Sequence, residues 1–295
     1  MPSLKVIRKR IASTKSTAKI TRAMKMVAGA RLVRAQQRIL ALRPYAVKTA
    51  EVAQSVARTM RSADTGDRAP HPMLARRPEQ TSLVLVLSAD RGLCGALNTN
   101  VNKNAERMWR EKRGASGKVV FATLGRKGRE YLARRRAEVI QDFPRVYEGL
   151  DLGKARLVAR WLAPRFEKGE VDSVFLLYSE FKSAITQKVT IDRLLPLSDP
   201  IPENDASVPS EFLYEPHRDA LLERLVPMYL EISIYRAMLE SQASFFGAQM
   251  TAMDAATRNA TEMIARLTLA YNRARQAAIT KELMEIIGGA EALKA

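Results

Sequence analysis

Apolar residues recur every seven positions along the last third of the chain. Between Met228 and Ile287 there is no proline, and Gly247 is the only glycine. One apolar series consists of Ile232, Leu239, Phe246, Met253, Ala260, Leu267 and Ala274. A seven-residue apolar repeat of this length predicts one long helix in a left-handed coiled coil. At 1.5 Å per residue the helix is about 90 Å long, more than one small domain can cover, so we expect other proteins to surround it.

The start of the chain shows the same periodicity. One series runs in sevens from Leu4 to Met60 and is broken only by Lys25, and a companion series begins at Ile7. This pattern predicts a second long helix, with Gly29 and Pro44 as local weak points. Both helices adjoin the middle of the chain, so they can pair along their lengths only in an antiparallel way.

The end of the last helix changes in character. Alanines replace the bulky side chains of Phe245 and Phe246, and an apolar tip follows that consists of Ile279, Leu283, Met284, Ile286 and Ile287. Two helices alone would leave this tip in water. Exposed apolar clusters usually mark a contact with a partner.

The middle of the chain alternates between apolar runs and helical patterns. Strands are expected at SLVLVLSA from Ser82, KVVFATLG from Lys118, VDSVFLLYSEF from Val171 and TQKVTIDRLLPL from Thr186, with helical stretches between them. Such alternation predicts a layered α/β domain. The expected fold is therefore a long antiparallel two-helix coiled coil, formed by the N- and C-terminal helices, plus a central Rossmann-like α/β domain.

Proline-rich and acidic stretches separate these parts. We expect an N-terminal coiled-coil helix over 1–60, a linker over 61–80, the α/β domain over 81–199, a second linker over 200–216 and the C-terminal coiled-coil helix over 217–295. Pro227 is expected to start or kink the last helix, because an interior proline removes a hydrogen bond.

Charge suggests the chemistry of the partners. The net charge is +18, and thirteen Lys or Arg residues precede Glu51, the first acidic residue. Such a helix could bind acidic protein loops or nucleic acid. Its clean apolar series, and the lack of any aromatic residue before Tyr45, favour protein loops; a basic coiled-coil nucleic-acid-binding protein is the alternative. No apolar run is long enough for a bilayer span and no signal sequence is recognisable, so we expect a soluble or peripheral protein.

Candidate chemical sites have plain structural explanations. The stretch SADRGLCGALN follows a strand and precedes a helix, but Gly92 and Gly95 lack the spacing of a dinucleotide-binding loop. The single cysteine, Cys94, has no general base beside it in the sequence, since the histidines, His71 and His217, lie in linker-like stretches. No residues have metal-ligand spacing. We therefore expect a non-catalytic protein without a cofactor or a metal.

Three stretches resemble the gamma subunit of the rotary F-type ATP synthase. They are KITRAMKMVAGARLVRAQ from Lys19 to Gln36, SADRGLCGALNTN in the middle, and YNRARQAAITKELMEIIGGAEAL from Tyr271 to Leu293. The resemblance implies a rotor shaft that couples rotation of the c-subunit ring to conformational change in the catalytic alpha and beta subunits of the head. It also implies contact with the epsilon subunit and a peripheral position on the cytoplasmic face of the bacterial inner membrane.

The resemblance also implies contact residues. Arg275, Gln276 and Thr280 match family residues that bind a loop of a catalytic subunit, with Glu282 and Glu285 nearby. Met24 matches a residue near the lower bearing in the head, and Tyr214 and Glu215 match the contact region over the c ring. The cysteine pair and loop insertions that regulate chloroplast members are missing, so redox control of that kind is not expected.

Overall fold

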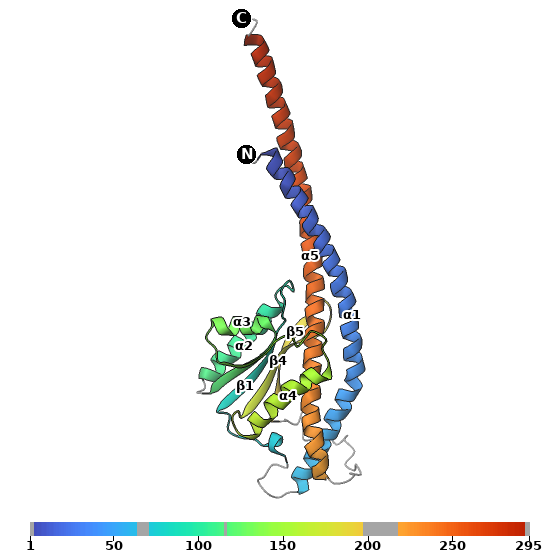
Figure 1. Cartoon of the computed structure of the whole chain (residues 1–295), viewed down its shortest axis with the longest axis vertical. Coiled ribbons are helices and arrows are strands. Elements are labelled where there is room, and N and C mark those ends of the chain that lie inside the picture. The colour runs from blue at the N-terminus through green and yellow to red at the C-terminus, as the bar shows by residue number, and fades with distance from the viewer. Residues whose placement is uncertain (1–2, 64–70, 115–116, 197–217, 293–295) are drawn as a thin grey trace. The chain divides into compact units, whose positions relative to one another are not determined.

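The computed structural model describes residues 3–63, 71–114, 117–196 and 218–292 (Figure 1). It divides into two compact units. The terminal unit consists of the chain up to Ala28 together with the chain from Gln249 onward, and the central unit is Gly29–Ala248. Each unit is described below by itself.

Two long helices contribute to both units, as the seven-residue repeats predicted. Helix α1 spans Leu4–Ala63 and helix α5 spans Arg218–Ala292. Pro44 lies inside α1 and Pro227 lies inside α5. Because α5 begins at Arg218 and continues through Pro227, the expectation that this proline could start the helix is wrong.

The two helices run antiparallel within each unit. In the terminal unit the hydroxyls of Thr21 and Thr257 share a hydrogen bond of 2.7 Å, while Lys25 contacts Asp254. In the central unit Arg31 lies over the Phe246 ring at 5.9 Å, and the Tyr45 hydroxyl donates to Met228 Sδ at 3.3 Å. The residue number therefore falls along α5 as it rises along α1, which confirms the predicted orientation.

The companion series is the more deeply buried of the two apolar series of α1. Its members Ile7, Thr21, Ala28, Ala35 and Thr49 are all buried, whereas most described members of the series from Leu4 are only half-buried. The buried threonines satisfy their hydroxyls by bonding to backbone carbonyls of the preceding turn. Four of these five side chains are small, and one of them, Thr21, contacts Thr257 of α5 directly.

A five-stranded sheet forms the centre of the central unit, in the order β3-β2-β1-β4-β5. Its strands are β1 Thr81–Leu87, β2 Lys118–Leu124, β3 Val139–Phe143, β4 Ser173–Phe181 and β5 Gln187–Leu195. Strands β1 to β4 are parallel to one another, and β5 is antiparallel to β4. This arrangement confirms the expected Rossmann-like α/β fold.

Helices cover both faces of the sheet. Leu83, Leu85 and Leu87 of β1 point to the face that packs against α4 (Leu152–Glu167) and α5. Val84 and Val86 point to the opposite face, which packs against α2 (Leu97–Gly114) and α3 (Arg126–Arg134). Since both faces are covered, β1 is an almost continuous run of buried apolar residues.

Sequence patterns missed β3 and the short 3-10 helix η1 (Pro72–Leu74). Strand β3 is at an edge of the sheet, and its sequence VIQDF includes Gln141 and Asp142. The hydroxyl of Thr123 donates to Asp142 Oδ1 at 2.8 Å, so a polar side chain is accommodated within the sheet. The strand therefore lacks the apolar pattern by which the other four were predicted.

Candidate partner-contact surface

Toward its end, α5 is no longer covered by other described residues of the terminal unit. Met253 and Ala260 are buried, Leu267 and Ala274 are half-buried, and every residue from Ile279 to Gly289 is exposed. The hydroxyl of Thr14 contacts Met263 Sδ at 3.9 Å, and α1 begins only ten residues before Thr14, at Leu4. The end of α5 accordingly extends past the beginning of α1 (Figure 1).

This uncovered end has an apolar stripe. Ile279, Leu283, Ile286 and Ile287 follow the spacing i, i+4, i+7 and i+8, which places them on one side of a helix. Their exposed fractions lie between 45% and 68%. The predicted apolar tip is therefore exposed in this chain, and such a stripe is typical of a helix that binds a partner.

Five of the predicted contact residues lie on the same end of α5: Arg275, Gln276, Thr280, Glu282 and Glu285. All five are exposed, and the structure does not gather them on one side. At about 100° per residue, Arg275, Glu282 and Glu285 share one side, whereas Gln276 and Thr280 lie about 100° to 140° around the helix from Arg275. Only Glu285 has an ion pair among the described residues, with Lys281 at 3.4 Å.

The remaining predicted contacts lie elsewhere. Met24 is half-buried on α1, in the terminal unit, one residue before the Lys25 that contacts Asp254. Tyr214 and Glu215 lie outside the described residues.

Helix α1 presents many unpaired basic side chains. Of the thirteen that precede Glu51, only Lys25 and Lys48 form ion pairs with acidic side chains within the described part of the chain. Several others, such as Arg22, are exposed. Because free cations attract anionic surfaces, α1 has the charge required to bind acidic protein loops.

The loop after β1 has a structural explanation. Asn98 of α2 holds it, because Oδ1 accepts from the backbone N–H of Ala89 at 3.0 Å and Nδ2 donates to the Arg91 carbonyl at 3.2 Å. Gly95 has a φ of +57°, a conformation that favours glycine. Cys94 is buried, and burial raises the pKa of its thiol, which disfavours the nucleophilic thiolate.

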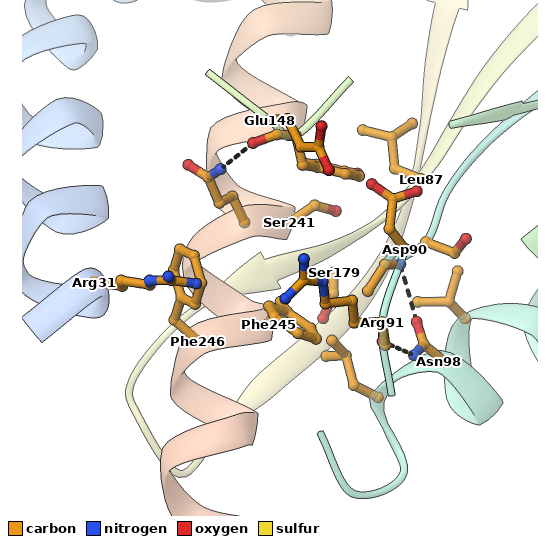
Figure 2. Close-up of a pocket in the computed structure, with 16 residues that line it drawn as sticks. Arg31, Leu87, Asp90, Arg91, Asn98, Glu148, Ser179, Ser241, Phe245 and Phe246 are labelled. Atoms are coloured by element: carbon orange, nitrogen blue, oxygen red, sulfur yellow. Dashed lines mark hydrogen bonds between the residues drawn. The ribbon is translucent and has the colours of Figure 1, made fainter. Parts of the chain in front are cut away.

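A cavity of about 470 Å³ in the central unit was not predicted (Figure 2). Its lining comes from α1, the loop after β1, α2, the segment before α4, β4 and α5. Part of the lining belongs to the stretch SADRGLCGALN, for which a structural explanation was expected from the sequence, and the rest comes from separate segments that share no motif. No group of three His, Cys, Asp or Glu side chains suited to a metal exists among the described residues.

None of the described helices is long and apolar enough to cross a membrane.

Comparison with known proteins places the whole chain in one family. The sequence model of the ATP synthase family matches residues 3–293. The ATP synthase gamma chain of Sorangium cellulosum (strain So ce56) is 54% identical, and the alignment covers all of both chains. The gamma chain of Anaeromyxobacter sp. (strain Fw109-5) is 49% identical, again over the full length of both chains.

Solved structures share the fold. A chain of the Euglena gracilis mitochondrial ATP synthase, from a structure of OSCP, F1 and the c-ring, has a TM-score of 0.68 at 20% identity, covering 98% of this chain and 94% of that chain. A chain of the Tetrahymena thermophila central stalk and c-ring has a TM-score of 0.58 over 80% of this chain and 99% of that chain. None of these similarities supports the nucleic-acid alternative. On the full-length matches, this chain belongs to the ATP synthase gamma chain family.

Proposed function

We propose that this gamma chain is the central rotor shaft of an F-type ATP synthase. In this role it transmits rotation of a c-subunit ring to the catalytic alpha and beta subunits, where ATP is made or hydrolysed. The observation that supports the proposal most directly is the uncovered end of α5, because an apolar stripe on a single exposed helix needs surrounding protein. A subunit that turns within a sleeve of partners would have such an end.

The predicted contact residues lie on different sides of α5, and this asymmetry provides the mechanism by which rotation would act on the catalytic sites. Arg275 with Glu282 lies on one side of α5, whereas Gln276 with Thr280 lies on another. Three identical catalytic sites arranged around this helix would each meet a different side of it. Rotation would then exchange the contacts, and differential contacts are what shift sites between conformations of different nucleotide affinity.

Helix α1, with its exposed basic side chains, fits the same arrangement. Its unpaired Lys and Arg side chains would attract acidic loops of the catalytic subunits without fixing any one position. Contacts of this kind between exposed charges are individually weak, which suits surfaces that must slide past one another.

The other assignments follow from the family. The chain would itself be non-catalytic, with Tyr214 and Glu215 near the c ring and the epsilon subunit bound to the α/β part. Met24 would lie at the lower bearing in the head. The complex would place the chain peripherally on the cytoplasmic face of the bacterial inner membrane.

Substitutions in the assembled complex test the proposal. Arg275→Ala and Gln276→Ala should lower proton-driven ATP synthesis in membrane vesicles while the amount of assembled complex stays unchanged. Arg113→Ala is the matched control, because Arg113 is exposed on the last turn of α2 in the central unit. Synthesis at the wild-type rate in both variants would remove these two residues from the mechanism.

A further inference from the structure

The cavity in the central unit lies where α/β proteins often bind ligands. Leu87, Ser88 and Ala89 line it from the carboxyl end of β1, and Ser179 lines it near the carboxyl end of β4. The strand order β3-β2-β1-β4-β5 reverses direction between β1 and β4, and ligands of open α/β sheets bind at such switch points. Its volume of about 470 Å³ is within the range of small-molecule sites.

Buried hydroxyls at this cavity lack hydrogen-bond partners. Ser179 and Ser241 are 2% and 7% exposed, and neither hydroxyl oxygen has a partner among the described residues. The buried hydroxyl of Tyr147 has no partner of normal hydrogen-bond geometry either; burial raises its pKa, and the neighbouring Ser241 hydroxyl opposes that rise. Since buried polar groups in proteins almost always have partners, the unpartnered Ser179 hydroxyl and the incompletely paired hydroxyls of Ser241 and Tyr147 indicate a bound molecule with polar groups of its own.

The charges at the cavity favour a single negative charge on that molecule. Figure 2 shows the side chain of Arg91 directed toward the space between Ser179 and Phe245, and its guanidinium has no ion pair with any described residue. The carboxylate of Asp90 accepts from the backbone N–H of Arg126 at 3.1 Å. Glu148 adds a second carboxylate and Arg31 a second cation, so the charges of the lining are balanced, and a molecule with several negative charges would be repelled by both carboxylates.

Another part of the cavity wall is formed by two aromatic rings, aliphatic side chains and Arg31. Phe245 and Phe246 of α5 lie with their ring centroids 5.6 Å apart, and Arg31 lies over the Phe246 ring at 5.9 Å. Leu97 and Val101 of α2 complete this wall. Aromatic walls favour ring-shaped ligands, because offset and edge-on ring pairs add to the apolar contact.

We propose that this cavity binds a small aromatic monoanion, such as a hydroxylated aromatic carboxylate. Its carboxylate would pair with Arg91, its ring would contact Phe245, and its hydroxyl would bond with Ser179, Ser241 or Tyr147. The bound molecule would link the end of β1 and β4 with α5, and it would therefore stabilise the central unit.

Titration of the full-length chain with 4-hydroxybenzoate, followed by two-dimensional NMR, tests the proposal. Saturable shifts are expected with a dissociation constant below about 5 mM, the value that ordinary ligand efficiency gives for a molecule of this size. Arg91→Gln should weaken binding by about tenfold or more, because it removes a charge-assisted hydrogen bond. Arg91 is exposed and forms no ion pair with a described residue, so its loss should leave the fold intact.

Further variants and probes separate the explanations. Ser241→Leu should abolish binding by filling the cavity, while Arg113→Gln on the last turn of α2 should leave the affinity unchanged. Benzyl alcohol should bind more weakly than 4-hydroxybenzoate, and ATP should not compete. The proposal is wrong if 4-hydroxybenzoate does not saturate, if Arg91→Gln binds it equally well, or if ATP displaces it.

Discussion

Lys25 of α1 donates a hydrogen bond from Nζ to Asp254 Oδ1 of α5 across 2.5 Å, in the terminal unit. Lys25 is the residue that interrupts the apolar series of the first helix. The hydroxyls of Thr21 and Thr257 pair about one turn away. Single polar residues in the seam of a coiled coil specify the alignment of its helices, at some cost in stability. The two polar pairs therefore fix the register of α1 against α5 in the terminal unit.

Lys25→Met should raise the pKa of Asp254 toward its ordinary value of 3.8. The hydrogen bond from Lys25 is the main cause of the lowered pKa, with Arg258 contributing. Because the folded-state pKa is lowered, the stabilisation by this pair is present above about pH 4 and is lost as the pH falls through the folded-state pKa. NMR titration of the Asp254 carboxyl carbon measures the change.

Lys19→Met is the control for this titration. Lys19 is exposed on α1 and forms no ion pair with a described residue, so its loss should leave the Asp254 titration where it is. An Asp254 pKa that stays low in Lys25→Met would show that Lys25 does not set it.

The long helices and most of the sheet could be predicted from the sequence, because the pattern of apolar residues follows the side of each helix or strand that is buried. Ile232, Leu239 and Met253 repeat in sevens and are buried, and β1 is an unbroken apolar run. Strand β3 could not be predicted, since Asp142 is stabilised by Thr123 from the neighbouring strand, a partner that local sequence does not reveal.

The two candidate sites also differ in whether the sequence could predict them. The uncovered end of α5 was predictable, because Ile279, Leu283 and Ile286 are close in sequence and no helix remained to cover them. The cavity was not predictable, because Ser179 and Ser241 are ordinary residues until the fold buries both hydroxyls without partners.

Gly247→Leu should lower the free energy of unfolding by about 1–3 kcal/mol. Gly247 is the only glycine between Met228 and Ile287, and a Cβ there would lie 3.3 Å from the backbone of Ala184 and from the Phe181 ring. The helix therefore needs glycine where α5 crosses the loop after β4. Chemical unfolding of the full-length chain measures the loss.

Gly288→Leu gives the matched comparison for Gly247. Both substitutions gain the same helix propensity, about 1 kcal/mol, but a Cβ at Gly288 would meet no atom within 4 Å. Gly288→Leu should therefore be neutral or stabilising in the isolated chain. Equal effects at the two positions would contradict the close contact.

Gly125→Ala should destabilise the central unit by about 2–5 kcal/mol. Gly125 has a φ of +101°, and an added Cβ would lie 2.0 Å from the Ser88 carbonyl oxygen. Ser88 also accepts a hydrogen bond from the backbone N–H of Gly128 at 2.7 Å, so the clash would disturb the start of α3. Chemical unfolding followed by circular dichroism provides the measurement.

Gly92→Ala is the control for Gly125. A Cβ at Gly92 would meet nothing within 4 Å, so the free energy of unfolding should change by less than about 0.5 kcal/mol. A large loss in Gly92→Ala, or none in Gly125→Ala, would show that glycine is needed in this region for another reason.

His71→Asn should make the stability of the chain less sensitive to acid. His71 is buried, and its Nδ1 accepts the Met73 backbone N–H at 3.1 Å, which only the neutral ring can do. Burial lowers its pKa below the ordinary 6.5, although Glu167 and Glu223 oppose the shift. Between the folded-state pKa and about pH 6.5 the unfolded chain binds a proton that the folded chain does not, so wild-type stability falls as the pH falls through this window.

Asparagine keeps an acceptor but does not titrate, so urea unfolding at about pH 7.5 and pH 5.5 should show a smaller loss in His71→Asn than in the wild type. An equal loss in both proteins would mean that other groups cause the acid sensitivity, because asparagine removes only the proton uptake of His71.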